Sequence, residues 1–141
     1  MSSDLYVFTA DPADLDRDLV HRWLSEQAYW ALGRPREMQD AAMDASRNYG
    51  VRRRDTGAQV AFARIVTDNA TFAWLCDVFV DPAERGNGVG KMLVRGALAD
   101  IEPLHLRRTL LATADAHGLY AANGFTALAA PDRMMERRIG L

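Results

Sequence analysis

This sequence has little cysteine, no long apolar run and no large excess of charge. Its single cysteine, Cys76, cannot form an internal disulfide. Its place in an apolar stretch predicts a small core residue, and a reactive thiol is the alternative. No apolar run approaches the ~20 residues of a membrane-spanning helix, and the polar start, residues 1–4, does not resemble a signal peptide. The formal charge of −2 gives no general attraction to nucleic acids or anionic membranes. We therefore expect a cytoplasmic protein that binds neither nucleic acid nor membrane.

Two common phosphate-binding motifs are missing as well. Gly86, Gly88 and Gly90 are spaced G-x-G-x-G, whereas dinucleotide-binding folds need G-x-G-x-x-G. The Walker motif needs Ser or Thr after Gly-Lys, but Gly90-Lys91 is followed by Met92. These differences disfavour a Rossmann-type nucleotide-binding domain.

The residues that are present predict one folded domain over residues 1–141. About half of the chain is apolar (49%), which is enough for a core at this length. Five segments read as strands from their apolar residues and from the turns that bound them: residues 5–9, 49–54, 60–66, 71–80 and 109–113. The tight turns in the middle of the chain indicate antiparallel neighbours, and the helical pattern over residues 89–99 indicates a parallel crossover to the last strand. The predicted fold class is α/β (α+β), with a mixed, largely antiparallel sheet flanked by helices.

Helices are expected between the first and second predicted strands and after the last strand. Asp11-Pro12 predicts the start of a first helix that runs to about Trp30. A second helix should follow Pro35, with its inner face formed by Met38, Ala41, Ala42 and Ala45. A short helix over residues 116–123 should precede a final strand, residues 134–139, at the edge of the sheet.

A glycine-rich turn between a strand and a helix is the most informative segment. Arg85, Gly88 and Gly90 follow the strand that ends at Val80 and lead directly into the helical pattern. The first turn of a helix has backbone N–H groups without partners and a positive dipole end, and glycines allow an anion to approach them closely. The turn therefore predicts an anion-binding loop, although a plain tight connection is the alternative.

The pattern Arg-x-x-Gly-x-Gly resembles the pyrophosphate-binding loop of the GCN5-related N-acetyltransferases (GNAT), which hold acetyl-CoA. Residues 116–125 are similar to the A-x-x-L-Y-x-x-x-G-F segment of the same family, so the two matches together span about residues 71–125. One departure is Thr113, where the family often has an asparagine that contacts coenzyme A or bound water. The resemblance implies these cofactor-binding residues: Phe79, Val80, Arg85, Gly86, Asn87, Gly88, Val89, Gly90, Lys91 and Thr113.

The resemblance also implies the chemistry of acetyl transfer from acetyl-CoA to an amine. Tyr120, by its place in the second motif, is the candidate acid for the leaving thiolate, and packing against the core is the alternative. Asp77 is the candidate base, because an acid in an apolar strand is costly unless it is paired or functional; the alternative is an ion pair with Arg64. Asp115 and His117 are further candidates for the base, and Glu84 is expected to be solvated.

Aromatic and charged residues predict the acceptor side. Tyr29, Trp30 and Arg34 lie where the first two helices meet, and could line a pocket for the amine or serve as core anchors. Arg64 is a charge within an apolar strand, so it lies either on an exposed edge or in a polar cleft.

The predicted function is acetyl-CoA-dependent N-acetyl transfer to a primary amine by direct transfer within a ternary complex, without a metal. The expected partner is a small-molecule or peptide amine, and a homodimer is a further hypothesis. The alternative is a catalytically silent coenzyme A-binding module with a regulatory role.

Overall fold

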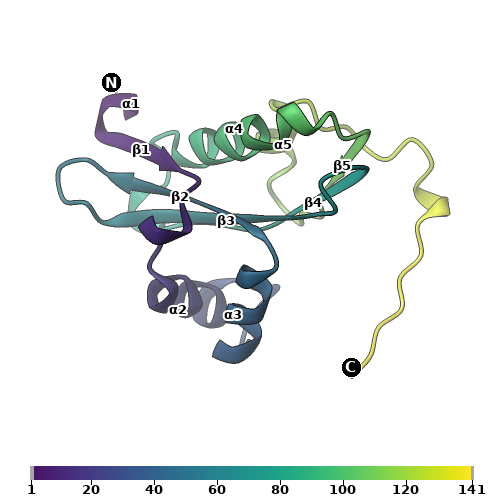
Figure 1. The fold of residues 1–141 in the computed structure, drawn as a ribbon, viewed down its shortest axis with the longest axis horizontal. Helices are drawn as coiled ribbons and strands as arrows, with labels where there is room; N and C mark the ends of the chain where they lie inside the picture. Colours follow the sequence, from purple (N-terminus) through teal and green to yellow (C-terminus); the bar gives the residue numbers. More distant parts are fainter. Residues whose placement is uncertain (1, 141) are drawn as a thin grey trace.

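A five-stranded sheet forms the centre of the computed structural model, which describes residues 2–140. The strands lie in chain order, and the first four are antiparallel, whereas β5 is parallel to β4 (Figure 1). Their bounds are β1 Tyr6–Thr9, β2 Arg47–Arg53, β3 Gln59–Thr67, β4 Phe72–Val80 and β5 Arg108–Leu110. The predicted mixed, largely antiparallel sheet is therefore confirmed.

Helices cover both faces of the sheet. In the view of Figure 1, α2 (Arg17–Gln27) and α3 (Arg36–Asp44) lie below the sheet, while α4 (Val89–Ile101) and α5 (His117–Ala121) lie above it. Each face has its own apolar cluster, one built with α4 and one with α2. The remaining helical turns are α1 Ser2–Leu5, η1 Pro12–Asp14, η2 Pro82–Glu84, η3 Glu102–Leu104 and η4 Pro131–Arg133.

The first long helix begins later than its sequence pattern predicts. Asp11 caps only the short turn η1, by accepting from the N–H of Ala13 (2.9 Å). Leu15 is then extended, and Asp16 caps α2 by accepting from the N–H of Leu19 (3.1 Å). Two Asp caps in succession therefore divide what looks like one helix, and α2 also ends at Gln27 rather than near residue 30.

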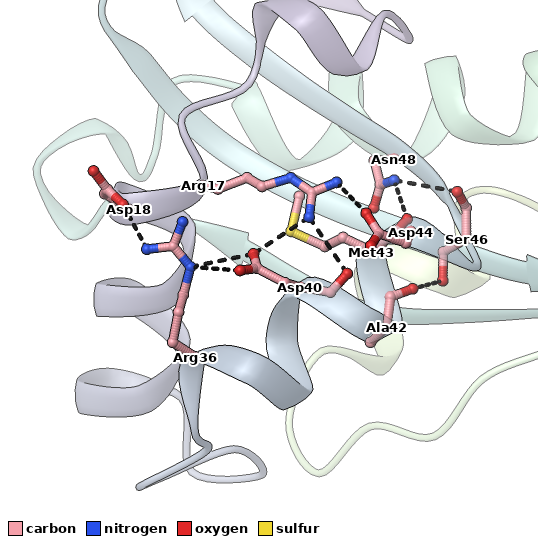
Figure 2. A network of polar contacts seen from close by, with 9 residues as sticks. All are labelled: Arg17, Asp18, Arg36, Asp40, Ala42, Met43, Asp44, Ser46 and Asn48. Atoms are coloured by element: carbon pink, nitrogen blue, oxygen red, sulfur yellow. Dashed lines mark hydrogen bonds and ion pairs between the residues drawn. The ribbon is translucent and has the colours of Figure 1, made fainter.

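The predicted inner face of α3 is wrong. Met38 is 58% exposed and Ala41 and Ala45 are exposed, whereas Gln39 and Met43 are buried. Polar contacts explain this rotation, because acidic side chains on α3 bind arginines that approach from α2 and from the start of α3 itself (Figure 2). Arg17 of α2 reaches Asp44 (2.7 Å) and Asp40 (3.3 Å), and Arg36 binds Asp18 and Asp40.

The predicted final strand over residues 134–139 is also wrong. In the part of the chain that the structure describes, no strand follows β5, and this segment runs away from the sheet as the yellow tail of Figure 1. Met135 is 94% exposed. An edge strand with one buried face needs apolar residues at alternate positions, and Met-Met-Glu-Arg-Arg-Ile does not alternate.

A close contact between α4 and β1 gives a prediction about stability. A Cβ at Gly96 would lie 2.6 Å from Cζ of Phe8 and closer still to Cδ1 and Cε1, and the ring cannot move freely because it stacks on Tyr49. Alanine is favoured over glycine in a helix by about 1 kcal/mol, but overpacking costs roughly 1–3 kcal/mol.

We therefore expect Gly96→Ala to lower the free energy of unfolding by about 1 kcal/mol. In a Phe8→Ala background the same change should be neutral or stabilising, because the overlapping ring is gone. Chemical denaturation of the four proteins measures this. A Gly96→Ala protein that is more stable than the parent with Phe8 in place would contradict the contact.

Candidate active site between β4, α2 and α5

Strands β4 and β5 pair over a short stretch and then separate. The pairing ends at Trp74 opposite Leu110, whereas β4 continues to Val80. The strand predicted over residues 109–113 is shorter in the structure, because its last three residues leave the sheet. Past Trp74, the edge of β4 on this side has no strand partner among the described residues. Its backbone groups are therefore available to a ligand.

A β-bulge in β4 turns Asp77 toward the helices α2 and α3. The β3–β4 register shifts between Phe62 and Arg64, and Asp77 has φ +53°, which non-glycine residues rarely adopt. Leu75 lies in the cluster built with α4, and Phe79 in the one built with α2. Without the bulge, strict alternation would point Asp77 into the same apolar cluster as Leu75.

Three donors surround the Asp77 carboxylate, which is 4% exposed. Oδ1 accepts from Nε1 of Trp30 (2.8 Å), and Oδ2 accepts from Nη1 of Arg34 and Nε of Arg64 (both 2.7 Å). Burial acts to raise the pKa of Asp77, but the hydrogen bonds from the two arginines outweigh it, so the pKa lies below its ordinary value. Asp77 is thus a charged, ion-paired carboxylate, and the pair with Arg64 considered from sequence is present.

Arg34 and Arg64 each donate to a second, neutral side chain as well. The fully buried Gln39 accepts from Nη1 of Arg34 through its Oε1 (2.9 Å), and Oγ of Ser46 accepts from Nη1 of Arg64 (3.1 Å). Ser46 in turn donates to the carbonyl of Ala42 at the end of α3 (2.6 Å; Figure 2). The position of α3 therefore fixes both guanidinium groups.

The four residues predicted for the acceptor side line one pocket. This pocket, here called the arginine pocket, has a volume of about 510 Å³. It is lined by Tyr29, Trp30, Arg34 and Arg64 together with Asp77, Cys76, Trp74, Thr113, Asp115 and Tyr120, among others. Tyr29 is 57% and Trp30 43% exposed, so the alternative that these two aromatics are core anchors is wrong.

The glycine turn before α4 has the geometry of an anion-binding loop. Gly86 and Gly88 have φ +85° and +80°, and Gly88 caps the helix without a side chain. The first N–H groups of α4 have no acceptor within the helix and lie at its positive end. Arg85 lies beside them, with Nε donating to the carbonyl of Val80 (3.1 Å) and its guanidinium 5.4 Å from the centre of the Phe79 ring.

Glu84 anchors this loop, which corrects the prediction that it is solvated. Oε1 of Glu84 accepts from the hydroxyl of Tyr6 (2.6 Å) and from Nη1 of Arg53 (3.0 Å). These hydrogen bonds, that of Tyr6 first, lower the pKa of the carboxyl. The turn is therefore tied to β1 and β2, contacts far apart in the sequence that no local pattern indicates.

A second pocket, here called the loop pocket, opens between the glycine turn and α5, with a volume of about 490 Å³. Of the predicted cofactor residues, it is lined by Phe79, Val80, Arg85, Gly86, Gly88, Val89 and Gly90. The other three do not line it. Asn87 donates to the carbonyl of Glu84 (3.1 Å), Lys91 is exposed on α4, and Oγ1 of Thr113 accepts from the N–H of Ala116 (3.1 Å).

Tyr120 lies where the two pockets meet, because it lines both. Its ring packs edge-on against Phe125, and its side chain is only 8% exposed. Burial, followed by the nearby Tyr29 and Asp115, raises the pKa of Tyr120 to about 12. Within residues 2–140 its hydroxyl has no hydrogen-bond partner, so both its proton and its lone pairs remain available to a ligand.

The remaining candidates occupy different positions. Asp115 lines both pockets, whereas His117 lines neither. The prediction that Cys76 is a core residue is wrong, because Cys76 is half-buried and lines the arginine pocket beside Asp77. Burial raises the pKa of its thiol to about 11, so the thiol is protonated at neutral pH and a poor nucleophile.

Two kinds of feature are absent from residues 2–140. No cluster of three or more His, Cys, Asp or Glu side chains is arranged to hold a metal ion there. None of the described helices combines the length and apolar character needed to cross a membrane.

Comparisons with known proteins agree with this architecture. Residues 17–125 match the acetyltransferase (GNAT) family. A crystal structure of a protein assigned to the GNAT family from Xanthomonas campestris pv. campestris is 44% identical, with a TM-score of 0.88 over 95% of this chain and 93% of that one. The Gibberella zeae protein FG08082, assigned to the acetyltransferases, is 29% identical over 84% of this chain and 77% of its own.

A more distant structure carries a ligand. Rv2747 from Mycobacterium tuberculosis, in complex with CoA and NLQ, shares the fold at 21% identity, with a TM-score of 0.71 over 86% of this chain and 72% of that one. The family match covers most of the sheet, the glycine turn and α5. The chain therefore belongs to the acetyltransferase (GNAT) family.

Proposed function

We propose that this protein is an N-acetyltransferase that moves the acetyl group of acetyl-CoA directly to a primary amine within a ternary complex. The observation that carries the proposal is the position of Tyr120, which lines both the loop pocket and the arginine pocket and carries a hydroxyl without a partner in the described chain. A thioester held in one pocket and an amine held in the other would meet beside this hydroxyl.

The loop pocket fits the cofactor by its chemistry. The N–H groups at the start of α4 and the guanidinium of Arg85 can bind the two negative phosphates, and the glycines leave no Cβ in the way. The free edge of β4 near Phe79 and Val80 offers backbone groups to the thioester. A donor aimed at the thioester oxygen would stabilise the charge that develops there.

Tyr120 supplies the proton for the departing sulfur. With a pKa of about 12 the phenol stays protonated throughout the physiological range, so it can donate to the thiolate as the C–S bond breaks. The new bond forms between the amine nitrogen and the acetyl carbon, and the amine loses its proton to solvent or to a nearby base.

Asp77 holds the acceptor pocket in shape rather than taking that proton. Its oxygens already accept from Trp30, Arg34 and Arg64, and its pKa is lowered, which makes it a weak base. Asp115, exposed and shared by both pockets, is placed to attract the amine as an ammonium ion before transfer.

Two measurements test the proposal. Calorimetry should give a one-to-one complex with coenzyme A, and release of free thiol from acetyl-CoA should depend on an added amine from a panel of small amines, amino acids and peptides. Binding of coenzyme A with no amine-dependent thiol release across the panel would favour the catalytically silent module instead.

Trp30 gives a test of the acceptor side. Trp30→Phe keeps an aromatic ring but removes the Nε1 donor to Asp77. A hydrogen bond to a charged group contributes roughly 1.5–3 kcal/mol, so we expect the acceptor KM to rise about tenfold or more while the coenzyme A affinity stays close to that of the parent. Steady-state kinetics measures the first and calorimetry the second. An acceptor KM close to that of the parent would remove Trp30 from the acceptor site.

A further inference from the structure

We propose that the acceptor amine carries an anionic group, a carboxylate or a phosphate, which binds to Arg34 and Arg64. This inference rests on the proposed function, since it names the class of amine that the arginine pocket selects. The observations that carry it are the charge of the cluster around Asp77, the donors that this cluster leaves unused, and its position relative to Tyr120.

The cluster around Asp77 has one positive charge in excess. Arg34 and Arg64 share a single carboxylate, and even a single oxygen of it, Oδ2. The two guanidinium groups are well shielded, with side chains 16% and 14% exposed. The other partners of these arginines, Gln39 and Ser46, are neutral. An uncompensated charge is costly away from water, and an anionic ligand would balance it.

Some N–H donors of Arg34 and Arg64 have no acceptor among the described residues. Arg34 uses only Nη1, for Asp77 and Gln39, and Arg64 uses Nε and Nη1. Among the described residues nothing accepts from Nε or Nη2 of Arg34 or from Nη2 of Arg64, yet both side chains line the arginine pocket. Guanidinium groups suit carboxylates and phosphates because their planar donors match two oxygens at once.

The arginine pocket has two chemically different ends. Tyr29, Trp30, Asp115 and Tyr120 line both pockets and so stand at the junction with the thioester, whereas Arg34 and Arg64 line only the arginine pocket. Asp115 would attract an ammonium group at the junction, and the arginines would bind an anion away from it. A volume of about 510 Å³ suits a small molecule. A zwitterionic amine, with its nitrogen at Tyr120 and its anion at the arginines, matches both ends.

Matched pairs of amines test this with the parent protein. One arm compares standard amino acids with their carboxamides, and the other compares amino alcohols with their phosphate esters. In at least one arm we expect the anionic member to have a kcat/KM about tenfold higher or more, the scale of one charge-assisted hydrogen bond. The arm that shows the preference identifies carboxylate or phosphate as the anion.

Arg64→Gln and Arg64→Lys test where the preference arises. Arg64→Gln should lower kcat/KM for the preferred anionic amine about tenfold more than for its neutral partner, and Arg64→Lys should retain part of the preference. Arg47→Gln is the matched control, because Arg47 is also a strand arginine paired with an aspartate, Asp100, but lines neither pocket. It should leave the preference ratio unchanged.

Neutral amines acetylated as well as anionic ones would overturn the inference and leave acetyl transfer intact. If no amine is acetylated, the same pairs are tested for binding to the protein loaded with coenzyme A, by thermal shift. Arginine-dependent binding of the anionic members alone would then support the inference while the proposed function fails. Equal binding of both members, or binding of neither, would overturn it.

Discussion

Tyr120→Phe should lower kcat by about 10²–10⁴-fold, the usual contribution of general acid–base catalysis. This corresponds to roughly 3–5 kcal/mol of barrier at 1.36 kcal/mol per tenfold change. The substitution keeps the ring that packs against Phe125 and removes only a hydroxyl without a partner in the described chain. Because this hydroxyl acts on the leaving sulfur in the transition state, the loss should appear in kcat rather than in the affinity for coenzyme A.

Tyr49→Phe is the control for this prediction. Tyr49 is fully buried and donates to Asp100 (2.7 Å) outside both pockets, so removal of its hydroxyl should lower stability and leave kcat unchanged. The pH profile gives a second check, because a pKa of about 12 for Tyr120 means that its ionisation should not reduce the rate between pH 7 and 10. A Tyr120→Phe kcat within about twofold of the parent would return Tyr120 to a packing role.

Gly88→Val should weaken coenzyme A binding by tenfold or more, on the order of 1.4 kcal/mol at least. Gly88 has φ +80° at the start of α4, a conformation that costs an L residue roughly 1–2 kcal/mol. A valine side chain would also stand where the anion must approach the first N–H groups of the helix. Calorimetry with coenzyme A measures the change.

Gly57→Val separates the effect of backbone strain on stability from the effect of the side chain on coenzyme A binding. Gly57 has nearly the same backbone, φ +75°, in the turn between β2 and β3, and a Cβ there meets nothing within 4 Å. This variant should share the loss of stability and keep the affinity for coenzyme A. A folded Gly88→Val protein that binds coenzyme A as tightly as the parent would remove the glycine turn from the cofactor site.

Local patterns predict the sheet and the glycine turn because both depend on short-range chemistry. Apolar runs separated by turn residues indicate β3 and β4, and the positive φ of Gly86 and Gly88 is what glycine allows. The same reasoning fails for α2 and α3. Two capping aspartates and a set of ion pairs between distant residues decide where α2 begins and which face of α3 is buried.

The acceptor side depends on the β-bulge in β4, which the spacing of residues in the sequence does not indicate. β4 is apolar at every position except Asp77, so its sequence has no alternation that a bulge would interrupt. Only the pairing with β3 reveals that Asp77 and Phe79 face α2 while Leu75 faces α4. The charge of Asp77 in an apolar strand is the one signal that could have suggested it, because a buried carboxylate needs partners such as Trp30, Arg34 and Arg64.

The most direct test of the account follows a labelled acetyl group. The protein is mixed with acetyl-CoA labelled in its acetyl carbons, with and without an amine that supports thiol release, and mass spectrometry locates the label. Direct transfer predicts that the label appears on the amine nitrogen and at no time on the protein, since the thiol of Cys76 is protonated at neutral pH. Label on the protein before the amine is added, or label found only in acetate, would contradict it.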